Sequence, residues 1–201
     1  MTDFFFLLDA ADEVDALGID QFEYLERDSS WELDLSSTTS RLIGIVNTQQ
    51  SIGWTTKGSH WVAYVVDLPS KYQNLRVTVF DSLAPTSKET MRRIATVAEA
   101  LAKASVTAQR KAATSHPPQR TLEPPSPYKN VKVQQVDQAN GPHQTDGFNC
   151  GIFALAYLLH VARTNQLHMH PTTRINFDEI REKVACSILV QRRVFGNAED
   201  E

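Results

Sequence analysis

Short runs of branched apolar residues, separated by polar turns, mark the first half of the chain. Residues 41–47 and 61–67 are rich in β-branched side chains and predict two buried strands. Turn residues at 68–74 separate the second run from residues 76–80, which we expect to form a third strand in a hairpin with the second. Residues 130–136 alternate apolar and polar positions, which predicts a fourth strand with one solvated face.

The pattern then changes to a helical period and afterwards to a proline-rich stretch. Thr86 and Glu89 have the spacing of a capping box, and the apolar residues that follow at helical intervals carry a helix to about Ser105. Five of the nine prolines lie between residues 114 and 127 among polar neighbours. We therefore predict an exposed, proline-rich insertion at about 106–128.

Two more helices are predicted near the end of the chain. Residues 151–160 are apolar nearly all round, which indicates a helix buried in the middle of the domain. A last helix begins after Asn176, with Glu179 completing a capping pattern and an apolar stripe that leads us to expect Cys186 in or near the core. The acidic tail, residues 196–201, is expected to fray.

Strands before and after a helix, with further helices flanking them, define the expected architecture. We predict a single α+β domain over residues 1–201, with a central mixed or antiparallel sheet packed against the buried helix. A chain of 201 residues is long enough to bury a core of its own.

Composition narrows the class of function. The net charge of -4 gives no basic face for nucleic acid, and no apolar run reaches the roughly 20 residues of a membrane span. The N-terminus lacks the basic region of a secretory signal, and two cysteines cannot form a disulfide framework, so we expect a reducing compartment, the cytoplasm or nucleus. We expect a monomer without a cofactor or metal. The histidines at 160, 168 and 170 have no acidic or cysteine ligand nearby, and we interpret them as polar loop residues.

The candidate chemistry begins at Cys150, which stands between a polar, turn-like segment and the predicted buried helix. A thiol at the start of a helix faces the positive end of the backbone dipole, which favours the nucleophilic thiolate. Gly151 follows directly and lets a substrate backbone approach without a Cβ in the way. The alternative reading is a small buried hydrophobic side chain.

A cysteine nucleophile needs a base, an acceptor that orients the base and donors for the oxyanion. His60 lies at the start of a predicted strand and Asp81 ends the neighbouring one, so paired strands about 4.8 Å apart would bring them together. Gln144, six residues before Cys150, is a candidate oxyanion donor beside the backbone N–H of Cys150. Taken singly, His60 could be a surface histidine and Asp81 an ordinary turn residue.

Taken together, His60-Trp61, Phe80-Asp81-Ser82 and the segment from Gln144 to Gly151 resemble the Ulp1-like cysteine peptidases. The order His, Asp, Gln, Cys is similar to that family's and opposite to that of papain-type enzymes, where the cysteine comes first. The resemblance implies a papain-like architecture and catalytic roles for His60, Asp81, Gln144 and Cys150.

The resemblance also implies a substrate. The family processes SUMO, NEDD8 or ubiquitin and removes them from conjugates, so the expected partners are a ubiquitin-like protein and its conjugates, in a host cell if the chain is a pathogen effector. Trp61 would line a narrow channel for the Gly-Gly tail, and Gly151 would border it. Asn149 stands where the family most often has aspartate, and Asp146 where asparagine is common.

Two other functions remain open from the sequence. YopJ-type acetyltransferases resemble this scaffold, although they usually have glutamate where this chain has Asp81. A non-catalytic binder of a ubiquitin-like protein is the third possibility.

Overall fold

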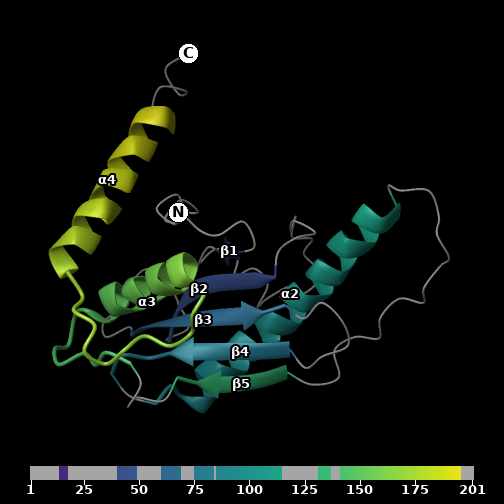
Figure 1. The fold of residues 1–201 in the computed structure, drawn as a ribbon, viewed down its shortest axis with the longest axis horizontal. Helices are drawn as coiled ribbons and strands as arrows, with labels where there is room; N and C mark the ends of the chain where they lie inside the picture. Colours follow the sequence, from purple (N-terminus) through teal and green to yellow (C-terminus); the bar gives the residue numbers. More distant parts are fainter. Residues whose placement is uncertain are drawn as a thin grey trace.

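A mixed β-sheet with helices on both faces forms the centre of the molecule (Figure 1). The computed structural model describes residues 14–17, 40–48, 60–68, 75–83, 85–114, 131–136 and 141–195. Most of the predicted proline-rich insertion and the whole acidic tail lie outside these ranges. The strands are β1 (Val14–Leu17), β2 (Arg41–Asn47), β3 (Trp61–Asp67), β4 (Leu75–Phe80) and β5 (Val131–Gln135). The helices are α2 (Lys88–Thr114), α3 (Cys150–Thr164) and α4 (Phe177–Phe195).

The sheet order follows the sequence, β1-β2-β3-β4-β5. The central strands β2, β3 and β4 run antiparallel, whereas β1 and β5 join the edges in parallel. The four predicted strands and the α+β class are therefore confirmed. The short strand β1 was not predicted, because four residues with a parallel partner far along the chain leave no turn or alternation signal.

Alternate residues of β3 point to opposite faces of the sheet. Val62, Tyr64 and Val66 belong to the core cluster shared with α2, whereas Ala63 and Val65 belong to the cluster shared with α3. Successive strand side chains point to opposite faces, so a strand covered on both sides reads as a continuous apolar run. Each buried valine contributes about 1.5–3 kcal/mol by leaving water.

The face under α2 contains one close backbone approach. Gly44 of β2 lies directly opposite Tyr64 of β3, whose side chain is fully buried. A Cβ at position 44 would lie within about 2.6 Å of the tyrosine ring carbon Cζ, so the ring occupies the space that any other residue would need. The glycine in the first apolar run is thus a packing requirement.

The other face is covered by α3, which lies in front of the sheet in Figure 1, with α4 leading away from one end of α3. Phe80 at the end of β4 stacks on Tyr157 of α3, with ring centroids 4.5 Å apart. Phe177 at the start of α4 packs on Phe153, with centroids 5.4 Å apart. The first contact holds α3 against the end of β4, and the second holds α4 against α3, near the end of the sheet where the candidate site forms.

Helix α2 differs from its prediction at both ends. Ser87, not Thr86, is the capping residue, because its Oγ accepts the backbone N–H of Thr90 at 3.1 Å. The helix continues past Ser105 to Thr114, so the first part of the predicted insertion is helical. The apolar stripe stops near Ser105, but the Ala, Gln, Arg and Lys residues that follow are strong helix formers and extend it toward the prolines.

Helix α4 begins as predicted, but its cysteine does not pack as predicted. Asn176 Oδ1 accepts the N–H of Glu179 at 3.2 Å, which confirms the cap. Ile180 and Val184 pack against the core, whereas Cys186 is exposed. Two residues turn a helix by about 200°, so Cys186 faces away from the stripe that contains Val184, and its assignment to the core was wrong.

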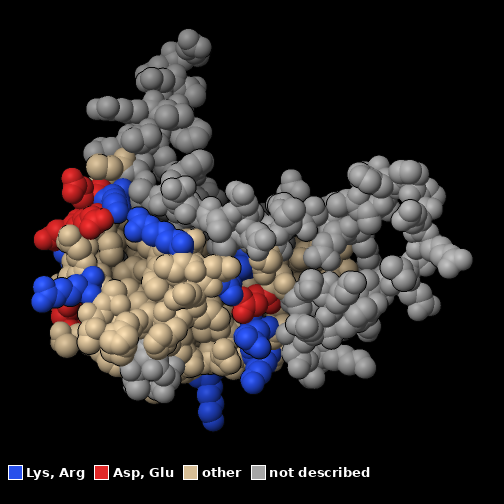
Figure 2. Space-filling view, viewed as in Figure 1, with Lys and Arg blue, Asp and Glu red and all other residues tan. Residues whose placement is uncertain are grey.

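Charges of both signs lie side by side over the start of α4 (Figure 2). Lys183 pairs with Glu179 at 2.5 Å, and Arg181 pairs with Asp178 at 3.3 Å. Such exposed pairs contribute about 0–1 kcal/mol each. Within the described ranges, no helix is long and apolar enough to cross a membrane.

Candidate active site

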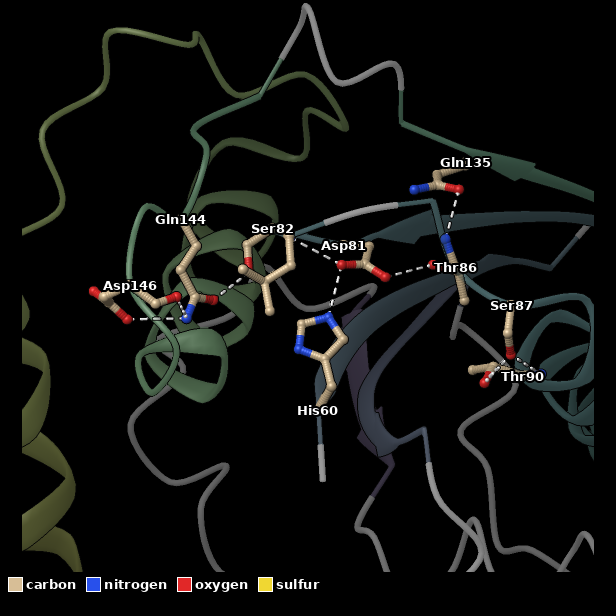
Figure 3. A network of polar contacts seen from close by, with 10 residues as sticks. His60, Asp81, Ser82, Thr86, Ser87, Thr90, Gln135, Gln144 and Asp146 are labelled. Carbon is tan, nitrogen blue, oxygen red and sulfur yellow. Dashed lines mark hydrogen bonds and ion pairs between the residues drawn. The ribbon is translucent and has the colours of Figure 1, made fainter. Parts of the chain in front are cut away.

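His60 and Asp81 meet where β3 begins and β4 ends. The two strands are antiparallel, so the residue before β3 lies beside the residue after β4. His60 Nε2 lies 2.7 Å from Asp81 Oδ1. Figure 3 marks this contact with a dashed line. The juxtaposition predicted from strand pairing is confirmed.

The Asp81 carboxylate is buried and held from several directions. Besides His60, Oδ1 accepts the backbone N–H of Leu83 at 3.1 Å, and Oδ2 accepts the hydroxyl of Thr86 at 3.0 Å (Figure 3). The Leu83 bond is an Asx turn, so the turn chemistry expected of an aspartate after a strand is present as well. A buried carboxylate with these donors has one orientation and holds the imidazole in one plane.

His60 is partly buried, with a side chain 20% exposed. Its hydrogen bond to Asp81 is the main cause that raises its pKa above 6.5; burial opposes the rise and the neighbouring Cys150 adds to it. The ring nitrogen not used by Asp81, Nδ1, is buried and has no well-formed hydrogen bond among the described residues. That nitrogen is therefore available to the thiol.

Cys150 is the first residue of α3 and is buried. Asn149 precedes it at the N-cap position but makes no capping hydrogen bond with its side chain, and the first turn of the helix has no acidic residue. The backbone N–H groups of the first turn therefore have no side-chain acceptor from the cap. Free N–H groups and the positive end of the helix dipole together suit a negative charge at this place.

Gln144 is buried next to the loop that carries Asp81. Its backbone N–H bonds to the carbonyl of Ser82 at 2.8 Å, and its Oε1 accepts the Ser82 hydroxyl at 3.0 Å. Its Nε2 donates to the carbonyl oxygen of Asp146 at 2.7 Å and to Asp146 Oδ1 at 3.0 Å (Figure 3). The amide nitrogen thus has two acceptors, both on Asp146 in the loop before Cys150.

Trp61 and Gly151 lie against each other, as their proposed shared role requires. A Cβ built on Gly151 would be 3.7 Å from Trp61 Cδ1 and 3.9 Å from Cγ. The indole therefore lies beside the backbone of Gly151, directly after Cys150. Six sequence-predicted site residues are consequently brought to one end of the sheet: His60, Trp61, Asp81, Gln144, Cys150 and Gly151.

The residues that support this site were not predicted from the sequence. Thr86 was assigned to a helix cap but bonds Asp81, and its backbone N–H donates to Gln135 Oε1 at 3.1 Å. Asp146 and Asn149 contact each other directly, with Asn149 Nδ2 donating to Asp146 Oδ2 at 2.7 Å. The sequence feature that points to this contact is the exchange of acid and amide at positions 146 and 149 relative to the family's usual residues. His160, considered as a metal ligand, instead bonds the carbonyl of His168 at 2.8 Å.

This arrangement and the comparison with known protein families define the class of protein as a cysteine peptidase. The model of the Ulp1 protease family, C-terminal catalytic domain, matches residues 52–193. The chain belongs to the Ulp1 protease family. No curated protein matches the sequence.

Solved structures that are similar to this chain are distant from it in sequence. A SUMO protease Ulp1 with its catalytic cysteine oxidised to a sulfinic acid is 16% identical, with 93% of this chain and 74% of that chain covered and a TM-score of 0.51. A sulfenic acid form of SUMO protease Ulp1 is 14% identical over 96% of this chain and 76% of that one, with a TM-score of 0.52. The Ulp1 protease domain in complex with Smt3, the yeast ortholog of SUMO, is 14% identical over 94% and 72%, with a TM-score of 0.47.

Proposed function

We propose that this chain hydrolyses the peptide or isopeptide bond after the C-terminal Gly-Gly of a ubiquitin-like modifier. The observation that carries the proposal is the His60–Asp81 pair, 2.7 Å apart, next to a cysteine at an uncapped helix start. Membership of the Ulp1 protease family supports the peptidase chemistry. The SUMO protease named among the structures that share its fold supports a ubiquitin-like substrate.

The proposed reaction begins at Cys150. His60 takes the thiol proton, and the thiolate attacks the carbonyl carbon of the terminal glycine of the modifier. The carbonyl π electrons move to oxygen, and the backbone N–H of Cys150 and the amide of Gln144 stabilise the resulting oxyanion. Asp81 holds the imidazole in place and stabilises its positive charge, as the 2.7 Å contact and the raised pKa of His60 support.

Collapse of the tetrahedral intermediate breaks the C–N bond. His60 gives its proton to the leaving amine, and the modifier remains on Cys150 as a thioester. Water then attacks the thioester with His60 as base, which releases the modifier as a free carboxylic acid and restores the thiol. Trp61, which lies against Gly151, would restrict the approach to Cys150 to residues without side chains, as a Gly-Gly tail would supply.

Electrophilic probes test the proposal. SUMO, NEDD8 and ubiquitin, each with a C-terminal electrophile, are incubated with the wild-type chain, and the modified residue is identified by mass spectrometry. We expect at least one probe to label Cys150 and to leave the exposed Cys186 unlabelled. Cys186→Ala is the matched control and should label at the wild-type rate, whereas Cys150→Ala should not label.

Three outcomes would overturn the proposal. Labelling at Cys186 instead of Cys150 would place the reactive thiol elsewhere. Binding of a modifier without labelling would favour a non-catalytic binder. Formation of an acetylated cysteine with acetyl-CoA, without cleavage of any modifier substrate, would favour an acetyltransferase.

A further inference from the structure

Asp146 is the centre of the hydrogen bonds in the loop that precedes Cys150. Its Oδ1 accepts the backbone N–H groups of Phe148 at 3.0 Å and of Asn149 at 2.9 Å, and its Oδ2 accepts Asn149 Nδ2 at 2.7 Å. These bonds, with that from Gln144, lower the pKa of Asp146 to about 2 and keep its carboxylate charged near neutral pH.

Asp146 also determines where the amide of Gln144 points. Gln144 Nε2 donates to two oxygens of this residue, Oδ1 at 3.0 Å and the backbone carbonyl at 2.7 Å. Ser82 holds the opposite end of the amide at 3.0 Å. An amide fixed at both ends loses little entropy when it donates to a developing charge.

Asn149 links this loop to α4. Arg181 of α4 donates to Asn149 Oδ1 at 2.5 Å, while its guanidinium lies 6.0 Å from the centre of the Phe177 ring. Phe177 in turn packs on Phe153 of α3. A continuous chain of contacts therefore runs from Gln144 through Asp146 and Asn149 to a helix outside the sheet layers.

We propose that Asp146 is a positioning residue that acts through Gln144, and that the Asn149–Arg181 contact fixes Asp146 for this purpose. The proposal rests on the proposed function, because it assigns Gln144 to the oxyanion. Its chemical content is that Asp146 Oδ1, held in place by the acid–amide pair with Asn149, orients Gln144 Nε2 and releases one of its N–H groups to the oxyanion as that charge forms. Asp146 itself touches no reacting atom in this scheme, and its effect is on the transition state rather than on substrate binding.

A double-mutant cycle separates this role from a merely structural one. With a fluorogenic modifier substrate, Asp146→Asn should lower kcat about tenfold with little change in KM, less than the roughly 10²-fold expected for Gln144→Ala. If Asp146 acts through Gln144, the double variant should be no slower than Gln144→Ala alone. Glu89→Gln, which removes a carboxylate from an exposed pair with Arg92, is the matched control and should keep wild-type kcat.

Exchange of the two residues provides a rescue. In Asp146→Asn, two amides face each other, whereas adding Asn149→Asp restores one carboxylate opposite one amide and places the charge next to Arg181. We expect the exchanged variant to recover most of the lost kcat. Losses that add in the double-mutant cycle, or an exchanged variant as slow as Asp146→Asn, would overturn the positioning role.

A readout independent of turnover distinguishes failure of this inference from failure of the proposed function. The side-chain amide signals of Gln144 in a ¹⁵N-correlated NMR spectrum are assigned by their loss in Gln144→Ala. They should shift and exchange faster with water in Asp146→Asn but not in Glu89→Gln. Unchanged signals would overturn the inference, whereas a wild-type chain that cleaves no modifier and reacts with no probe would overturn the proposed function.

Discussion

The starts of α2 and α3 are built in opposite ways. At α2, Ser87 caps the backbone N–H of Thr90, and Glu89 places a negative charge in the first turn. At α3, Asn149 occupies the cap position without capping, and the first turn has no acidic residue. An absent cap typically costs about 1 kcal/mol of stability. It leaves the N–H groups and the positive dipole end free to meet an anion.

Helix α4 shows that the difference is local. Asn176 caps α4 by bonding the N–H of Glu179, as Ser87 does at α2. Asn149 has the same side chain as Asn176 but directs it to Asp146 and Arg181. Among the described helices, therefore, the one that starts with Cys150 is the one without a side-chain cap.

The largest expected effect comes from removing the reacting groups at the start of α3. Cys150→Ser and His60→Ala should each lower kcat/KM for a modifier substrate by about 10⁵-fold or more, because residues that act as a unit fail together. Steady-state kinetics measures the loss, and thermal unfolding of the same variants checks that the fold persists. Cys186→Ser is the control, and a comparable loss in that variant would show that the thiol was assigned wrongly.

Asp81→Asn should have the next largest effect, a loss of about 10³-fold in kcat/KM, because the base loses its orientation and its charge partner. The hydrogen bond to Asp81 is the main cause of the raised His60 pKa, so the variant should also titrate His60 at lower pH by NMR. A wild-type His60 pKa that does not exceed that of the variant would contradict the assignment.

The His60–Asp81 pair should also change how the free energy of unfolding depends on pH. A folded-state pKa raised above the unfolded value means that protonated His60 stabilises the fold fully below pH 6.5. That contribution is lost as the pH rises through the raised folded value. The difference in unfolding free energy between wild type and Asp81→Asn should therefore shrink as the pH rises from 6.5 through the folded value.

Gln144→Ala tests the proposed oxyanion donor next to the start of α3. We expect kcat to fall by about 10²-fold with KM little changed, because the amide would act only on the developing charge. Burst and steady-state rates with the same modifier substrate separate acylation from release. An unchanged kcat would remove Gln144 from the site.

Elements with a strong local pattern were predictable from the sequence, and residues defined by contacts between distant segments were not. Antiparallel pairing of two apolar runs was enough to place His60 beside Asp81. Nothing near Asp146 in the chain indicates Arg181, because their connection through Asn149 depends on how α4 returns to α3. Similarly, Thr86 and Ser87 both fit a capping pattern, and the buried carboxylate of Asp81 decides that Thr86 turns to the site instead.

The smallest expected effect tests whether capping and chemistry are separable. Ser87→Ala should lower the unfolding free energy by about 1 kcal/mol, which for a domain of this size moves the melting temperature by about 2–4 °C. Asn176→Ala should do the same at α4, and neither should change kcat. Ser87→Ala is the stricter of the two tests, because the adjacent Thr86 donates a hydrogen bond to Asp81. A fall in kcat in Ser87→Ala that is absent in Asn176→Ala would show that the start of α2 supports the site through Thr86. In that case the start of α2 would contribute to catalysis as well as to stability, and the contrast with the start of α3 would not hold.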